Sequence, residues 1–161
     1  QDVTLMPGVI LQGATTIAPG AVIGPDTTLQ DVEVGENATV IRSHGSFAII
    51  GDGANIGAGT IFANYDGVNK STTHVGNSAF IGSNSVLVAP VDISDGAFVA
   101  AGSAVTDDVP AGGLAVARGR QRNVDDWLVR RRPGSKAARA AAESDGNVHP
   151  AVAESRAKKK E

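Results

Sequence analysis

The sequence predicts an all-β fold in which the chain winds as a parallel β-helix. Aliphatic side chains recur six residues apart, most regularly at Val75, Ile81, Leu87, Ile93, Val99 and Val105. A small or β-branched residue follows most of them four places later, and 20 of the 161 residues are glycine. A period of six fits neither a helix nor a simple strand alternation. It fits short strands joined by tight corners, three of which make one triangular coil.

The same spacing runs through the first half of the chain, at Leu11, Ile17, Ile23, Leu29, Val34, Val40, Ile50 and Ile56, with a shift of one residue before Val34. Each aliphatic residue is expected to point inward and to stack on its equivalent one coil away. Glycine at the corners permits backbone angles with φ above zero. The aromatic content of 4% suits an interior that we expect to be too narrow for rings. A β-sandwich with regular turns is the alternative fold.

Two interruptions break the repeat. His44–Phe47 lengthens the interval between Val40 and Ile50, and we expect a bulged corner there. Ala63–Thr73 is predicted to leave the body as a loop, because Asn64-Tyr65-Asp66-Gly67 has the composition of a turn. Loops on rigid scaffolds often carry functional residues, so this loop is a candidate site.

Three parts of the chain are expected. The β-helix covers residues 1–118 and ends with a closing strand over Leu114–Arg118. An arm follows over 119–134, with a short helix over Asn123–Arg132 that Asn123 could cap. Residues 135–161 are rich in Ala, Lys and Glu, and we expect this tail to be mostly disordered.

Composition and charge narrow the possible functions. Without cysteine there is no disulfide framework and no thiolate zinc site. No apolar run approaches 18 residues and no secretory signal is visible, so a cytoplasmic protein without a membrane partner is expected. The first 117 residues carry 2 Lys+Arg against 11 Asp+Glu, whereas the remainder carries 12 against 6. The basic tail lacks interleaved aromatic residues, which favours a solubilising role over nucleic-acid binding.

Three longer motifs point to a family. IGAGTIFANYDGVNKSTTHVG, IGSNSVLVAPVDISDGAFVAAGSAVTDDVPAGGLAVAR and QRNVDDWLVRRRPGS resemble the C-terminal acetyltransferase domain of the bacterial bifunctional GlmU enzymes. The resemblance covers residues 1 to 135 and implies a left-handed β-helix that forms a homotrimer. It implies acetyl-CoA as co-substrate, bound in clefts between subunits, and no metal in this domain. The implied reaction N-acetylates glucosamine 1-phosphate in UDP-N-acetylglucosamine and peptidoglycan biosynthesis.

The resemblance also assigns residues. The positions that match acetyl-CoA contacts are Ala58, Asn64, Tyr65, Ser83, Ala101 and Arg118. The positions that match sugar-phosphate contacts are Asn55 and Lys70. The chemistry itself requires a base near the attacking amine and a hydrogen-bond donor for the thioester oxygen. The Ser83 hydroxyl or a backbone N–H could supply that donor.

The chain also departs from the family pattern. An Arg-Pro-Gly coil, a lysine-bearing coil and the histidine-bearing segment before IGAGT are missing, yet Ile50 and Ile56 stay in register. We therefore assign no catalytic residue and expect impaired activity. His44 or His74 could act as a base, although surface histidines are the more ordinary interpretation, and neither fits a three-histidine metal site. The alternative function is a non-catalytic, trimeric β-helix module.

Overall fold

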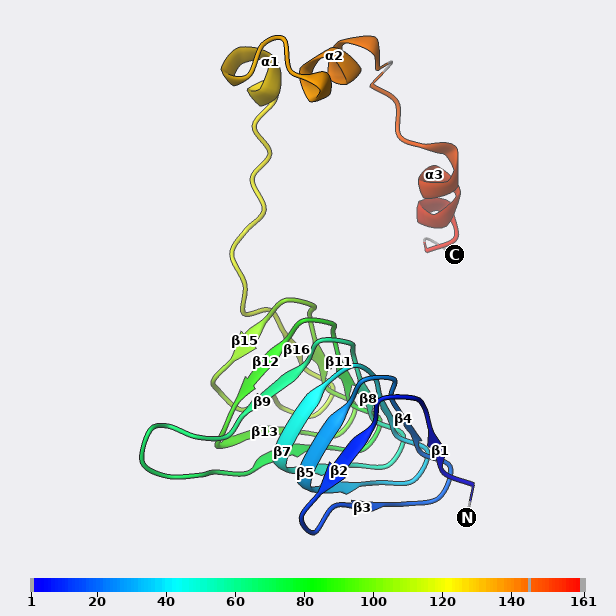
Figure 1. The fold of residues 1–161 in the computed structure, drawn as a ribbon, viewed down its shortest axis with the longest axis vertical. Coiled ribbons are helices and arrows are strands. Elements are labelled where there is room, and N and C mark those ends of the chain that lie inside the picture. Colours follow the sequence, from blue (N-terminus) through cyan, green and yellow to red (C-terminus); the bar gives the residue numbers. More distant parts are fainter. Residues whose placement is uncertain (1, 145, 160–161) are drawn as a thin grey trace. The chain divides into compact units, whose positions relative to one another are not determined.

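A computed structural model describes residues 2–144 and 146–159. The chain forms two compact units, Gln1–Gly119 and Arg120–Glu161, which are described one at a time. The first unit is a solenoid of short parallel strands (Figure 1), which confirms the predicted parallel β-helix. Successive coils contribute strands to three faces, here called faces A, B and C. The left-handed sense remains the one that the family resemblance implies.

Face A is a seven-stranded sheet. Its strands, in spatial order, are β1 (Thr4–Leu5), β4 (Val22–Ile23), β6 (Thr39–Val40), β8 (Asn55–Ile56), β11 (Phe80–Ile81), β14 (Phe98–Val99) and β16 (Leu114–Ala115). The predicted closing strand is thus shorter than Leu114–Arg118. Pairing nevertheless continues beyond β16, because the Ala104 N–H donates to the Ala117 carbonyl over 2.9 Å.

Faces B and C share a nine-stranded sheet. Face B contains β2 (Ile10–Gln12), the first halves of β5 (Thr28–Val34) and β7 (His44–Ile50), and then β9 (Ile61–Ala63), β12 (Val86–Val88) and β15 (Ala104–Val105). Face C contains β3 (Thr16–Ile17), the second halves of β5 and β7, β10 (Thr73–Val75) and β13 (Val91–Ile93). Because β5 and β7 bend within their length, one strand serves two faces.

The core is the set of inward side chains predicted from the period of six. On face A, Ile23, Val40, Ile56, Ile81 and Val99 follow one another in register and are all fully buried. The predicted companion residues are also buried: Ala21, Thr27, Ala38, Ala54, Thr60, Ala79, Ser85, Val91, Ala97 and Ser103. Removing each aliphatic side chain from water contributes about 1.5–3 kcal/mol, so the repeat itself is the main source of stability.

The expectation that rings do not fit inside is wrong at one position. Phe62 is only 2% exposed and is the largest buried side chain. Its space comes from Gly45 in the preceding coil, where an added Cβ would lie 3.5 Å from the Phe62 ring and 3.0 Å from Leu29. The missing side chain of Gly45 and the large side chain of Phe62 therefore compensate each other in volume.

The predicted bulge at His44–Phe47 is also corrected. Gly45 occupies the inward position of an ordinary coil, in register with Leu29 of β5. Phe47, with φ 51°, forms the bend between the two halves of β7, just as Asp31, with φ 53°, does in β5. The repeat seemed to be interrupted because glycine replaces the inward aliphatic residue and because the steps from Val40 to Gly45 and from Gly45 to Ile50 are five residues each.

The coils on either side of Ile50–Ile56 join without distortion. Ile56 lies between Val40 and Ile81 in face A. At the nearby corner, side-chain oxygens accept hydrogen bonds from the backbone of the preceding coil, with Asp52 bound to the Glu36 N–H over 2.7 Å and Asn77 bound to the Asp52 N–H over 2.8 Å. Asp95 continues this ladder by accepting from the Asn77 N–H over 2.7 Å. The joint is therefore part of the regular solenoid.

Over its described residues, the second unit contains three short helices, α1 (Trp127–Arg131), α2 (Lys136–Glu143) and α3 (Pro150–Ala157). Helix α1 begins four residues after Asn123, which instead accepts a side-chain hydrogen bond from Gln121. Helices α2 and α3 lie inside the tail for which composition predicts disorder; Ser135 caps α2 by accepting from the Ala138 N–H over 3.1 Å. Residues 145, 160 and 161 of that tail lie outside the described residues, and the three-part division of the chain stays a prediction.

Replacing Phe62 with alanine tests the volume compensation. We expect Phe62→Ala to lower the free energy of unfolding by about 3–5 kcal/mol, because it leaves a cavity beside Gly45. Urea unfolding followed by circular dichroism measures the change. The matched control is Ile61→Ala, because Ile61 precedes Phe62 in β9 but is 41% exposed. Equal losses for the two variants would contradict the buried position of the Phe62 ring.

Candidate active site

Four of the residues assigned to acetyl-CoA form one column along the corner between faces A and B. The Ala58 carbonyl accepts from the Asn84 N–H over 2.8 Å, and the Ser83 carbonyl accepts from the Gly102 N–H over 2.9 Å. Arg118 closes the column, because its Nη1 donates to the Ala101 carbonyl over 2.8 Å. Sequence positions as distant as 58 and 118 are thus brought to one edge of the solenoid.

Glycines make this column possible. A Cβ at Gly57 would lie 2.6 Å from the Ile81 carbonyl oxygen, and one at Gly82 would lie 2.4 Å from the Ala101 nitrogen. Any larger residue would force the neighbouring coils apart. Ser83, Ala101 and Arg118 are exposed beside these contacts, so the corner presents a hydroxyl, small side chains and one guanidinium to solvent.

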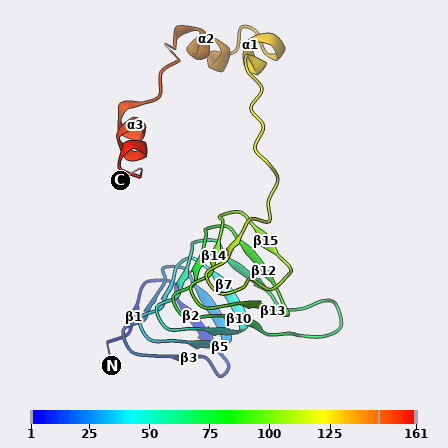
Figure 2. The ribbon, with the colours of Figure 1, turned by 180° about the vertical axis from the view of Figure 1, so that it is seen from behind.

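The predicted loop is an ordered hairpin-like excursion between β9 and β10, and it extends away from the coils (Figures 1 and 2). The Ser71 N–H donates to the Asn64 carbonyl over 2.8 Å, and Tyr65 pairs with Lys70 in an antiparallel bridge. At the tip, Asp66 Oδ1 accepts from the Val68 and Asn69 N–H groups over 2.8 and 2.6 Å. These bonds hold the pKa of the exposed Asp66 carboxyl below its usual value, with the Asn69 bond as the largest cause.

Asn64 and Tyr65 sit at the base of this loop, where the chain leaves face B. Asn64 is half-buried, whereas Tyr65 is exposed and donates its hydroxyl hydrogen to the Gly67 carbonyl over 2.6 Å. The loop thus holds the tyrosine ring in one orientation instead of leaving it to rotate freely.

The two residues assigned to the sugar phosphate lie in different places. Asn55 belongs to β8 and faces outward on face A, in register with Phe80. Lys70 belongs to the loop, and its Nζ lies 4.9 Å from the centre of the Phe47 ring at the bend of β7. A single chain therefore does not bring Asn55 and Lys70 together.

A pair formed by His74 and Asp92 was not predicted from the sequence. His74 in β10 is in register with Asp92 in β13, and its Nδ1 contacts Asp92 Oδ1. Ser94 Oγ donates to the second oxygen, Asp92 Oδ2, over 2.9 Å. The hydrogen bond from His74, followed by that from Ser94, holds the pKa of the Asp92 carboxyl below its usual 3.8. The sequence contained a signal for this pair, because the step of 18 residues from His74 to Asp92 equals the step from Ile81 to Val99.

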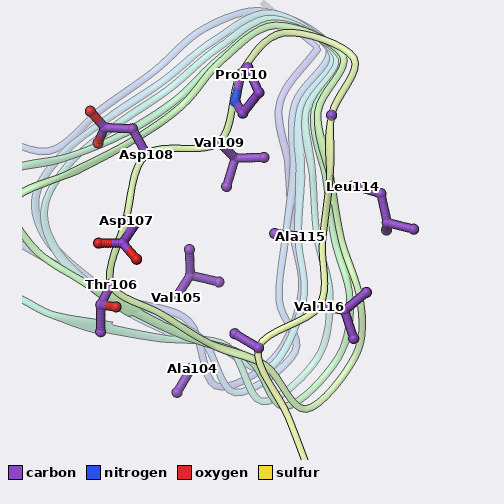
Figure 3. A pocket seen from close by; sticks show the side chains of 12 residues that line it. Ala104, Val105, Thr106, Asp107, Asp108, Val109, Pro110, Leu114, Ala115 and Val116 are labelled. Atoms are coloured by element: carbon purple, nitrogen blue, oxygen red, sulfur yellow. The ribbon is translucent and has the colours of Figure 1, made fainter.

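A hollow of about 290 Å³ lies at the C-terminal end of the solenoid. Figure 3 shows Val105, Val109 and Ala115 pointing into the last coil, with Leu114 and Val116 turned outward. None of the residues assigned to acetyl-CoA or sugar lines this hollow. It is the open end of the core and adjoins the column, because the lining residue Ala117 directly precedes Arg118.

Two further findings on the described residues concern metal ions and membranes. Among residues 2–144 and 146–159, no group of three or more histidine, cysteine or acidic side chains is placed to hold a metal ion. Within the same ranges, no helix has the length and apolar character needed to cross a membrane.

The fold and its period of six define the class of protein: a hexapeptide-repeat β-helix. The family described as the hexapeptide repeat of succinyl-transferase matches residues 73–107. A hexapeptide transferase family protein from Anaplasma phagocytophilum has the same fold, with a TM-score of 0.56 and 20% identity over 88% of this chain and 87% of that one.

The resemblance to the GlmU enzymes that the motifs indicated is also confirmed. The chain is similar to the bifunctional protein GlmU of Rhodococcus opacus, with 42% identity over 88% of this chain and 39% of the relative. GlmU of Mycolicibacterium smegmatis is 38% identical over 91% of this chain and 41% of the relative. The chain thus spans about two fifths of these relatives' length. The Rhodococcus alignment extends over 193 positions, more than the 161 residues of the chain, so the relative has residues there without a counterpart.

The pKa of Asp92 offers a direct test of its contact with His74. In His74→Gln we expect the Asp92 pKa to rise towards 3.8, because the largest cause of its depression is removed. The folded state gains stability from this carboxylate above its usual pKa and loses it as pH falls through the lowered value. Carboxyl-carbon NMR titration measures the shift. Ser94→Ala is the control and should produce a smaller rise; an unchanged Asp92 pKa in His74→Gln would refute the contact.

Proposed function

We propose that the chain binds acetyl-CoA and transfers the acetyl group to the amine of glucosamine 1-phosphate, giving N-acetylglucosamine 1-phosphate and CoA. The observation that carries this proposal is the corner column, in which Ala58, Ser83, Ala101 and Arg118 come together from four successive coils. These are the positions that the resemblance to GlmU assigns to acetyl-CoA.

The column has suitable chemistry for the acyl donor. Arg118 offers a permanently charged, planar donor to the phosphates of CoA. Small side chains at Ala58 and Ala101 leave the corner open to an extended pantetheine chain. The Ser83 hydroxyl is available to the thioester oxygen, where negative charge develops as the amine attacks. Asn64 and Tyr65, fixed by the hairpin-like loop, would shape the cleft from the other edge of face B.

The sugar half of the site needs a second copy of the chain. Asn55 on face A and Lys70 on the loop lie apart in one chain, so they can serve one substrate only across a subunit boundary. We therefore propose a homotrimer with the clefts between its subunits. Closed rotational symmetry would place the loop of each copy against its neighbour. The enzyme would be cytoplasmic and would supply UDP-N-acetylglucosamine for cell-wall peptidoglycan.

A second function is favoured by the alignment. Positions present in the GlmU relative have no counterpart here, while the joint between Ile50 and Ile56 keeps its register. The family's histidine base belongs to a segment that this sequence lacks. A chain that keeps the scaffold and loses these coils would be an impaired enzyme, or a non-catalytic trimeric module that still binds CoA.

Release of CoA distinguishes the two functions. The chain has no cysteine, so a thiol reagent reports free CoA without a background from the protein. Purified chain, acetyl-CoA and glucosamine 1-phosphate are expected to give thiol release that depends on the amine. Absence of release from a sample with the circular dichroism of folded β-structure would reject the enzyme in favour of the structural module.

Binding of acetyl-CoA tests the column independently of turnover. We expect Arg118→Ala to raise the Kd for acetyl-CoA about tenfold, because a charged hydrogen bond is worth about 1.5–3 kcal/mol and every 1.4 kcal/mol changes affinity tenfold. Isothermal titration calorimetry measures the change. Arg139→Ala, in α2 and outside the column, is the matched control. Equal affinities for the two variants would show that the column does not bind CoA.

A further inference from the structure

His74 and Asp92 have the geometry of an oriented acid–base pair on face C. Both side chains are about half exposed, at 47% and 46%. Asp92 Oδ1 contacts His74 Nδ1, while Asp92 Oδ2 accepts from Ser94 Oγ over 2.9 Å. The Asp92 N–H also donates to Asp108 Oδ1 over 2.8 Å. The aspartate is therefore fixed from three sides, and it fixes the imidazole in turn.

This arrangement selects one tautomer of neutral His74. A carboxylate that accepts from Nδ1–H leaves Nε2 as the unprotonated ring nitrogen, which can accept a proton. On the other side of β10, the position in register with His74 is Ile49 of β7, an uncharged residue. The pair is thus distinct from the corner ladder of Asp52, Asn77 and Asp95.

The position of the pair relates it to the loop. His74 is the second residue of β10, and β10 begins where the chain returns from the loop that carries Tyr65 and Lys70. The regular stacking of β10 between β7 and β13 makes its strand a rigid support. In one chain His74 on face C lies apart from the column at the corner between faces A and B, so this base would serve an acyl donor held by the column of a neighbouring copy.

We propose that His74 is the general base of the acetyl transfer and that Asp92 is its positioning residue. The inference rests on the function proposed above. His74 would take the role of the histidine in the family segment that this sequence lacks. The amine nitrogen attacks the thioester carbon, and its proton passes to His74 Nε2. The tetrahedral intermediate then collapses with cleavage of the C–S bond. The leaving thiolate takes the proton from His74, which restores the neutral imidazole and yields CoA.

The decisive variant is His74→Gln, assayed as the full chain with acetyl-CoA and glucosamine 1-phosphate. We expect kcat to fall about 10²- to 10⁴-fold, the usual contribution of general-base catalysis, with the Kd for acetyl-CoA within about twofold of the wild type. Asp92→Asn should lower kcat and alter its pH profile, because an amide no longer fixes the tautomer. Asp92→Glu should restore part of the loss.

His44→Gln is the matched control, since His44 is an exposed histidine of the neighbouring strand β7 and lies on face B. It should retain wild-type kcat, and circular dichroism should show all variants folded. Wild-type kcat in His74→Gln would overturn the proposed base while leaving the proposed function intact. A wild-type chain that binds acetyl-CoA and releases no CoA would overturn both.

Discussion

The structure depends on the contact between one coil and the next. Every coil must give its backbone hydrogen bonds to its neighbours, at strand spacings of about 4.8 Å, while its inward side chains fill a shared triangular interior. That spacing leaves no room for a Cβ at Gly57 or Gly82. It also explains why small residues occupy the corners and why Asp52, Asn77 and Asp95 accept hydrogen bonds from the coil before.

The same constraint decides what could be predicted. Inward aliphatic residues and their small companions are set by a strictly local period, so the sequence pattern found them directly. Phe62 escaped prediction because its size is matched by Gly45 in another coil, and a single-position rule for aromatic residues does not include such compensation. Helix α2 escaped prediction because composition alone ignored the cap that Ser135 provides.

For a related reason, the sequence predicted one part of the candidate site, the column, and missed another part, the pair of His74 and Asp92. The column from Ala58 to Arg118 follows from the motifs, since each motif occupies the same corner of its own coil. The pair of His74 and Asp92 requires the length of one particular coil, which fixes the register between two strands. The outward side chains of His74 and Asp92 meet because they are equivalents one coil apart, so reading the motifs one at a time misses the pair unless the coil length is also counted.

This separation of inward and outward residues explains how a β-helix can lose whole coils and keep its fold. A coil contacts only its neighbours, so removing whole coils leaves two compatible surfaces if the inward residues stay in register. Ile56 between Val40 and Ile81 meets that condition. The outward residues of a removed coil are not replaced in this way, because their functional groups are lost together with the coil. If the chain carries out the proposed reaction, the chemistry of a removed coil would come from the coils that remain, and the oriented histidine of face C is our proposal for that role.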